Sequence, residues 1–376
     1  MAYLDHNATA PLREAAKIAA ERAFAIGGNA SSVHAAGRAA RAMIEDARAQ
    51  VAALAGAEPN EVVFTSGATE ADSIALWGAA RGAIDAEARL TRLFVSAIEH
   101  PAVLANAVAV TEQFAGIRLQ AIPTGGDGVV DLEALRAMLR QGKGRALIAL
   151  MAANNETGVI QPVAQAAALA AEAGALLLVD AVQAPGRMPL PRADYVTLSG
   201  HKIGAPQGSG ALILKAGAPF TPPITGGGQE RGLRAGTENL SGIAGFGAAA
   251  EIVAGERFSP ALRDRFEAGL RVLAARSVIF GVGAPRLANT SCFALPGIAA
   301  ETALMALDLD GVMLSSGSAC SSGKVKRSHV LAAMGVNDEV AGGALRASFG
   351  WNSTEADVEA ALSSIANLLA RTRAAA

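Results

Sequence analysis

The chain has 376 residues, of which 51% are hydrophobic and 18% charged, and its formal net charge at pH 7 is -2. This composition excludes a disordered or fibrous protein, and the length predicts two to three units, which we take as one large and one small domain. The nearly balanced charge gives no attraction to nucleic acid or to an anionic membrane surface. A small-molecule partner is therefore favoured.

No apolar stretch reaches the roughly 20 residues needed to span a bilayer. The N-terminus MAYLDHNATAPLR lacks a basic start followed by an apolar run, so we expect no signal peptide and a cytoplasmic protein. The chain has only two cysteines, Cys292 and Cys320. Two cysteines form no disulfide framework and cannot alone hold a metal or an iron–sulfur cluster, so we expect no metal site and only thiol chemistry.

Apolar runs with β-branched residues alternate with longer alanine-rich segments of helical period in the first two-thirds of the chain. We expect strands at residues 61–67, 92–97, 145–153 and 175–182, and helices at 69–83, 100–114 and 162–174. Such alternation is typical of βαβ units, in which a mostly parallel sheet carries helices on both faces. The sequence thus predicts an α/β domain over residues 12–255.

The pattern changes after residue 255. A long helical segment at 256–277 is followed by short strand-like pieces and by a closing helix from Thr354. We expect residues 1–11 and 256–376 to form a smaller α+β domain. Its irregular stretch at about 314–328 contains Cys320, and an unstructured segment of that length is usually a functional lid or a disordered loop.

Lys202 stands in the turn after the predicted strand YVTL and is flanked by Ser199 and His201. An isolated lysine is more often a surface residue of a loop. Lysine also forms Schiff bases, and the flanking serine and histidine suit a phosphate beside that amine, as pyridoxal phosphate (PLP) requires. Asp180 ends the strand LLLVD, where a carboxylate can face a protonated pyridine nitrogen, although a capping or turn aspartate is the simpler alternative.

Two further groups follow predicted strands at the same edge of the sheet. Gly67, Ala68 and Thr69 open a helix and can cradle a phosphate with main-chain N–H groups and a hydroxyl, although such residues are also ordinary helix starts. His100 follows the next strand. A lone histidine is more often structural, but this one is placed to stack on a cofactor ring and to handle protons.

Eight motifs stand along the chain in the order LDHNATAPL, FTSGATEAD, IEHPAV, ANNETG, VDAVQAPGR, SGHKIGAPQGSGAL, GGGQERGLRAGTEN and SSGSACSSG. In these motifs the chain resembles the cysteine desulfurases of the class V aminotransferase group, which are fold type I PLP-dependent transferases. The likeness is nearest to the nitrogen-fixation and housekeeping iron–sulfur-assembly branch. It implies a large domain with a mostly parallel sheet, a smaller C-terminal α+β domain and a homodimer.

The resemblance also implies a role for each matching residue. Lys202 would be the Schiff-base lysine, Asp180 the partner of the pyridine nitrogen, Gln183 the donor to the ring hydroxyl and His100 the stacking and catalytic histidine. The phosphate would be held by four residues of one subunit and one of its partner, namely Ala68, Thr69, Ser199 and His201 with Thr237 from the second subunit. Asn155 and Arg346 would orient the substrate carboxylate. Cys320 would accept the sulfur.

The cofactor site alone does not decide the reaction, because the same residues would serve an aminotransferase or a selenocysteine lyase. Cys320 favours a cysteine desulfurase, which converts L-cysteine to L-alanine and carries the sulfur as a persulfide to iron–sulfur assembly or to another acceptor or scaffold protein. Family members often have an acidic residue and a proline shortly after this cysteine. Here Lys324, Lys326 and Arg327 make the stretch basic. We therefore expect the recognition of the acceptor or the pKa of the thiol to differ from that of relatives.

Overall fold

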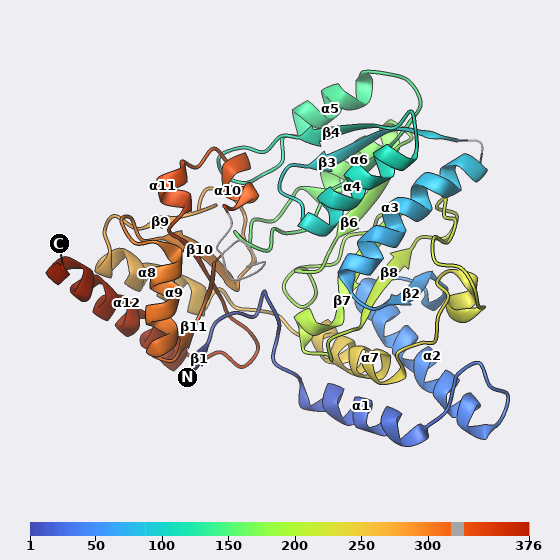
Figure 1. Cartoon of the computed structure of the whole chain (residues 1–376), viewed down its shortest axis with the longest axis horizontal. Helices are drawn as coiled ribbons and strands as arrows, with labels where there is room; N and C mark the ends of the chain where they lie inside the picture. The colour runs from blue at the N-terminus through green and yellow to red at the C-terminus, as the bar shows by residue number, and fades with distance from the viewer. Residues whose placement is uncertain (87, 317–326, 376) are drawn as a thin grey trace.

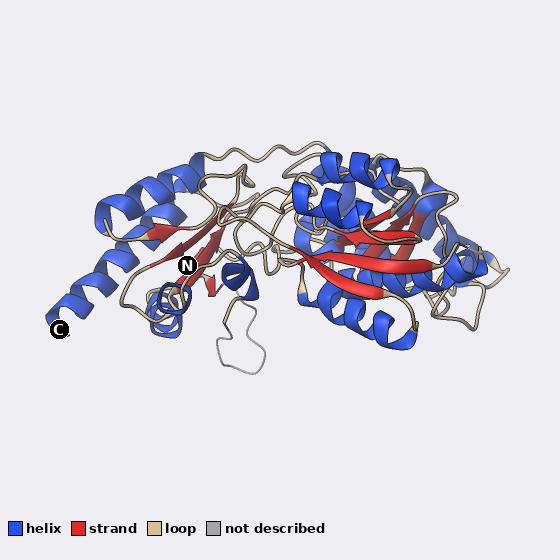
Figure 2. Ribbon diagram, turned by 90° about the horizontal axis from the view of Figure 1, so that it is seen from above, coloured by secondary structure: helices blue, strands red, loops and turns tan. Residues whose placement is uncertain are grey.

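The computed structural model describes residues 1–86, 88–316 and 327–375. Figures 1 and 2 show two parts side by side: a large part built from the first two-thirds of the chain and a smaller part that contains both termini. None of the helices within these ranges is long and apolar enough to cross a membrane.

A seven-stranded sheet forms the centre of the large part. Its order is β2 (Val62–Thr65), β8 (Gly210–Leu214), β7 (Tyr195–Ser199), β6 (Leu176–Asp180), β5 (Arg145–Ala149), β3 (Leu90–Ser96) and β4 (Arg118–Ile122). Strand β8 runs antiparallel to both of its neighbours, and all other pairs are parallel. The expected mostly parallel sheet is therefore confirmed.

Helices cover both faces of this sheet because successive strand residues point to opposite sides. Val63 packs in one apolar cluster and Phe64 in the other. The cluster of Val63 contains α3 (Ala68–Asp85) and α4 (Pro101–Gln113). The cluster of Phe64 contains α1 (Glu14–Ile26), α2 (Ala35–Ala55), α5 (Leu132–Arg140), α6 (Val163–Glu172) and α7 (Leu240–Ala254).

The smaller part contains an antiparallel sheet in the order β12 (Ser315–Ser316), β13 (Ala344–Ser348), β10 (Thr290–Ala294) and β9 (Val278–Ile279). The first residues of the chain also belong to the smaller part, since β1 (Ala2–Tyr3) pairs in parallel with β11 (Val312–Met313) in a separate sheet. Its helices are α8 (Ala261–Leu273), α9 (Ala300–Leu309), α10 (His329–Ala333), α11 (Asp338–Ala341) and α12 (Glu355–Ala375). The division at residues 11/12 and 255/256 stays a proposal.

Candidate active site

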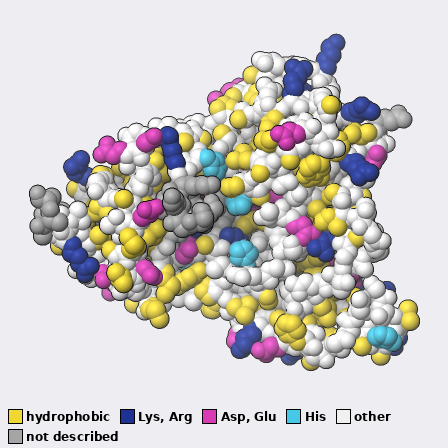
Figure 3. Space-filling view, in the orientation of Figure 1, with side chains coloured by type: hydrophobic (Ala, Val, Ile, Leu, Met, Phe, Trp, Pro, Cys, Tyr) yellow, Lys and Arg dark blue, Asp and Glu magenta, His cyan; other side chains and the backbone are white. Residues whose placement is uncertain are grey.

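A cavity of about 640 Å3 opens at the carboxyl ends of the parallel strands. On the face shown in Figure 3, histidine side chains gather around a hollow in the middle of the molecule. The large part supplies most of the lining, and Asn7, Ser315, Ser316 and Arg346 add residues from the N-terminal segment and the smaller part. Ligands of open α/β sheets bind at this edge, so the cavity is the candidate active site.

The cavity brings together most of the residues predicted from the sequence. Its lining includes Ala68, Thr69, His100, Asn155, Asp180, Gln183, Ser199, His201, Lys202 and Arg346. Thr237 is absent from it and lies in a small neighbouring depression that also contains Ser66 and Gly208. Its predicted role in a second subunit stays a prediction. Cys320 lies outside the described residues.

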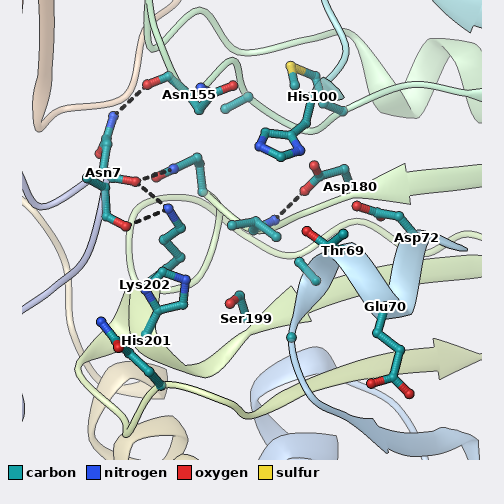
Figure 4. Close-up of a pocket in the computed structure, with 18 of the residues that line it drawn as sticks. Asn7, Thr69, Glu70, Asp72, His100, Asn155, Asp180, Ser199, His201 and Lys202 are labelled. Carbon is teal, nitrogen blue, oxygen red and sulfur yellow. Dashed lines mark hydrogen bonds between the residues drawn. The ribbon is translucent and has the colours of Figure 1, made fainter. Parts of the chain in front are cut away.

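The amino group of Lys202 is held at the inner end of the cavity. Lys202 belongs to a 3-10 turn, Gly200–Ile203, that directly follows β7. Its Nζ donates hydrogen bonds to the main-chain oxygens of Asn7 at 2.7 Å and of Ala8 at 2.8 Å (Figure 4). Burial lowers the pKa of Lys202 to about 8, and the positive charges of nearby arginines act in the same direction. The amine therefore loses its proton far more readily than an exposed lysine, and a minor fraction of it is neutral near neutral pH.

Asp180 ends β6 and points into the cavity (Figure 4). The main-chain N–H of Val182 donates to its Oδ1 at 2.9 Å. Burial raises the pKa of Asp180, while this hydrogen bond and the positive charge of Lys202 oppose the shift. A cationic partner in the cavity would keep this carboxylate ionised.

Asp72 and Glu99 are two further buried carboxyl groups that sequence reasoning missed. Asp72 lines the cavity and accepts a hydrogen bond of 2.6 Å from the Thr197 hydroxyl. Burial, followed by the negative charge of Asp180, raises the pKa of each group well above its ordinary value. These shifts favour the protonated form of both groups, whereas at Asp180 the hydrogen bond from Val182 and the positive charge of Lys202 oppose the shift.

His100 begins α4 and lies opposite Asp180 (Figure 4). Its Nδ1 accepts from the main-chain N–H of Ala102 at 3.2 Å, so the hydrogen-bond network assigns the ring proton to Nε2. Burial is the main cause that lowers the pKa of His100. The ring is therefore a neutral imidazole, which suits stacking on an aromatic cofactor and donation to a substrate.

The turn before α3 forms an anion cradle. No side chain caps the first turn of α3, so its main-chain N–H groups stay available to a ligand. A Cβ at Gly210 would lie 2.6 Å from the Cα of Gly67, which explains why β8 has glycine where this turn crosses it. Ser199 and His201 face the same space, and burial with the charge of Lys202 lowers the pKa of His201 to about 4.

Arg346 lies in β13 and enters the cavity from the smaller part. Its guanidinium donates to Asp5 at 2.7 Å and to the main-chain oxygen of Asn155 at 3.0 Å. Its Nε is a buried donor with no partner among the described residues. Arg346 lines a cavity with room for a ligand, and a carboxylate is the group that a guanidinium binds best.

Gln183 is oriented by two residues that were not predicted. Its amide nitrogen donates to the main-chain oxygen of Asn7 at 3.1 Å, and its oxygen accepts from Arg187. One N–H of the Gln183 amide is thereby left for a ligand. The role of Asn7 could not be read from the sequence, because its contribution here is a main-chain oxygen brought in from the N-terminal segment.

These donors and acceptors fit pyridoxal phosphate. The amine of Lys202 can bind the aldehyde, and the carboxylate of Asp180 can pair with the ring nitrogen. The amide of Gln183 can donate to the ring hydroxyl, and the start of α3 can bind the phosphate. The cavity volume is ample for a molecule of this size together with an amino acid.

Comparisons with known proteins agree with this geometry. The family model described as Aminotransferase class-V matches residues 2–361. The chain is 41% identical to the IscS-like cysteine desulfurase of Mycobacterium tuberculosis, over 100% of this chain and 98% of that protein. It is 42% identical to a cysteine desulfurase of Cereibacter sphaeroides, over 99% of this chain and 96% of that one.

Solved structures give the same result. A NifS-like protein superimposes with a TM-score of 0.89 at 33% identity, over 98% of this chain and 100% of its own. A NifS-like protein from Rickettsia africae has a TM-score of 0.86 at 32% identity, over 98% and 99% of the two chains. The chain belongs to the aminotransferase class-V family and, within it, to the cysteine desulfurases.

Proposed function

We propose that the protein is a PLP-dependent cysteine desulfurase that converts L-cysteine to L-alanine and binds the released sulfur as a persulfide on Cys320. The observation that carries this proposal is the cavity itself, which gathers Lys202, Asp180, His100 and Arg346 at one edge of the sheet. Full-length likeness to proteins named cysteine desulfurase supports the choice of reaction.

In this proposal the cofactor is held by residues that already face the cavity. Lys202 binds its aldehyde, Asp180 its ring nitrogen and Gln183 its hydroxyl, while His100 stacks on the ring. Its phosphate is bound by Ala68, Thr69, Ser199 and His201, with Thr237 of a second subunit. When bound, pyridoxal phosphate supplies an electron sink that lets the substrate lose its Cα proton and then its sulfur.

The protein's own groups perform the remaining steps. Arg346 and Asn155 bind the substrate carboxylate, so that the Cα proton faces the Lys202 amine. The lowered pKa of Lys202, about 8, leaves enough neutral amine to accept that proton. His100, as a neutral imidazole with its proton on Nε2, can donate to the substrate.

Sulfur leaves when the Cys320 thiolate attacks it. A bond forms between the two sulfur atoms and the carbon–sulfur bond of the substrate breaks. The electron pair stays on the three-carbon fragment, which takes up a proton and leaves as L-alanine. L-cysteine and one thiol thus give L-alanine and one persulfide, without an external oxidant or reductant.

Both ends of the segment that carries Cys320 support this role. Ser315 and Ser316, at the N-terminal end, line the cavity, and Ser315 pairs with Arg346 across two strands. At the C-terminal end, the Ser328 hydroxyl donates to Glu156 at 2.5 Å, and Glu156 directly follows Asn155. The Nε2 of His329 donates to the main-chain oxygen of Glu99, beside His100, at 2.8 Å.

The experiment is turnover of L-cysteine by the loaded enzyme without any keto acid. We expect alanine from the parent and a loss of at least about 100-fold in Cys320→Ala, because the nucleophile is removed. Cys292→Ala is the matched control, since that cysteine is fully buried and we expect unchanged turnover.

An aminotransferase would make no alanine under these conditions, and a selenocysteine lyase would act on selenocysteine in preference to cysteine. Parental turnover in the Cys320→Ala variant would contradict the persulfide step. The sulfur acceptor, the homodimer and a cytoplasmic location stay predictions from the sequence.

A further inference from the structure

Asn7 is a buried residue that joins the two parts of the molecule, with an exposed fraction of 1%. Its side-chain Nδ2 donates to the Thr290 hydroxyl at 2.9 Å and to the main-chain oxygen of Asn155 at 3.2 Å. Its Oδ1 accepts from Arg187 at 2.9 Å and from Asn289 at 3.2 Å. All four hydrogen-bonding positions of the amide are used, which fixes the residue in one orientation.

The main chain of Asn7 faces the reactive lysine. Its N–H donates to the Ser348 hydroxyl at 2.9 Å, and its carbonyl oxygen accepts from Lys202 at 2.7 Å and from Gln183 at 3.1 Å. The carbonyl of Ala8 accepts a second hydrogen bond from Lys202 at 2.8 Å (Figure 4). The side-chain contacts of Asn7 therefore fix the main-chain segment that accepts hydrogen bonds from the Lys202 amino group.

We propose that Asn7 is a positioning residue for Lys202: its side chain fixes the two main-chain oxygens that receive the free amino group. The inference rests on the proposed function only in that Lys202 must be free when it accepts the substrate proton. Two fixed acceptors direct two of its hydrogens toward the main-chain oxygens of Asn7 and Ala8. The remaining valence of the nitrogen then points into the cavity, where a substrate lies.

The charged groups around Lys202 oppose one another. Arg346 and Arg187 lower its pKa, and Asp180 and Asp5 raise it, while burial favours the neutral amine. The imidazoles of His100 and His201 have lowered pKa values and stay neutral.

Asn7 has no net charge and acts through its carbonyl dipole. An accepted hydrogen bond stabilises the ammonium form, so a loosened peptide shifts the amine toward its neutral form. Asn7 also accepts a hydrogen bond from Arg187. Loss of this hydrogen bond would let Arg187 approach the Lys202 amine, and its positive charge would also lower the pKa of Lys202.

The test measures Lys202 directly in the cofactor-free protein, without turnover. Trace amounts of an amine-acylating reagent are applied across a pH series, and labelling of the Lys202 peptide is read by mass spectrometry. For Asn7→Ala we expect the midpoint of the labelling curve to fall by roughly one pH unit, the size of one lost hydrogen bond to a charged group. Asn7→Ser retains one polar atom and should shift it less in the same direction.

Asn106→Ala is the control for general loss of packing. Asn106 also makes several side-chain hydrogen bonds, with Ser73, Trp77 and the main chain of Ala102, but lies outside the cavity lining. We expect it to lower stability and leave the Lys202 midpoint unchanged. Unchanged midpoints in both folded Asn7 variants, or an equal shift in Asn106→Ala, would overturn the proposal. Failure of cofactor binding would instead count against the proposed function, because this readout needs no cofactor.

Discussion

Two aspartates of one cavity differ in their surroundings and so in their expected chemistry. Asp180 accepts a main-chain N–H and lies near the positive charge of Lys202. Asp72 is bonded only to the Thr197 hydroxyl among the described residues, and burial with the charge of Asp180 raises its pKa well above the usual range. Residue type alone could not separate the two groups.

Asn substitutions at the two positions test this difference. In Asp180→Asn the charge that we propose keeps the ring nitrogen protonated is lost, and we expect kcat to fall by about 100-fold or more. In Asp72→Asn a carboxyl group whose raised pKa favours the neutral form is replaced by a neutral amide that can still accept from Thr197. We expect kcat/KM to change by less than about fivefold, which corresponds to under 1 kcal/mol. Steady-state kinetics of both PLP-loaded variants test this difference. Equal losses of activity in the two variants would contradict the different roles given to Asp180 and Asp72.

Sequence reasoning at the residue scale found side chains better than main-chain groups. Lys202, Asp180 and His100 were predicted because each follows a strand and has a characteristic chemistry. Asn7 and Arg187 were missed because their contacts join segments far apart in the chain, 7 with 187 and with 202. No local pattern reports such contacts.

At the scale of elements, the contact between β8 and the start of α3 determines the shape of the anion cradle. The turn at residues 66–68 crosses β8 at Gly210, where a side chain has no room. The sequence predicted α3 and the strand before it with bounds within a few residues of those observed. It could not predict that a later antiparallel strand would lie against the turn.

Gly210→Ala is expected to weaken cofactor binding without removing any cofactor contact. Its new Cβ would meet Gly67 Cα at 2.6 Å, so the turn must shift. Overpacking of this kind costs about 1–3 kcal/mol, and we expect the Kd of pyridoxal phosphate to rise roughly tenfold or more. Gly255→Ala is the control, since its nearest atom is 3.7 Å away and its φ of -89° suits alanine. Unchanged cofactor affinity in Gly210→Ala, measured by absorbance titration, would contradict the account.

At the scale of the whole molecule, the cavity lies between two parts that the N-terminal segment connects. Strand β1 pairs with β11 of the smaller part, while Asn7 and Ala8 contact Lys202 of the large part. The βα alternation predicted the large sheet because that signal is local. How the smaller part brings Arg346 to the same cavity depends on packing between distant segments, which periodicity does not encode.

The central claim is that sulfur from L-cysteine moves to Cys320, and mass spectrometry tests it most directly. The loaded enzyme is exposed briefly to L-cysteine, its thiols are blocked, and the intact protein and its peptides are weighed. The account predicts one added sulfur atom per chain, on the peptide that contains Cys320, with L-alanine formed in equal amount. Alanine formed with no added sulfur, or sulfur found on the peptide of the buried Cys292, would contradict it.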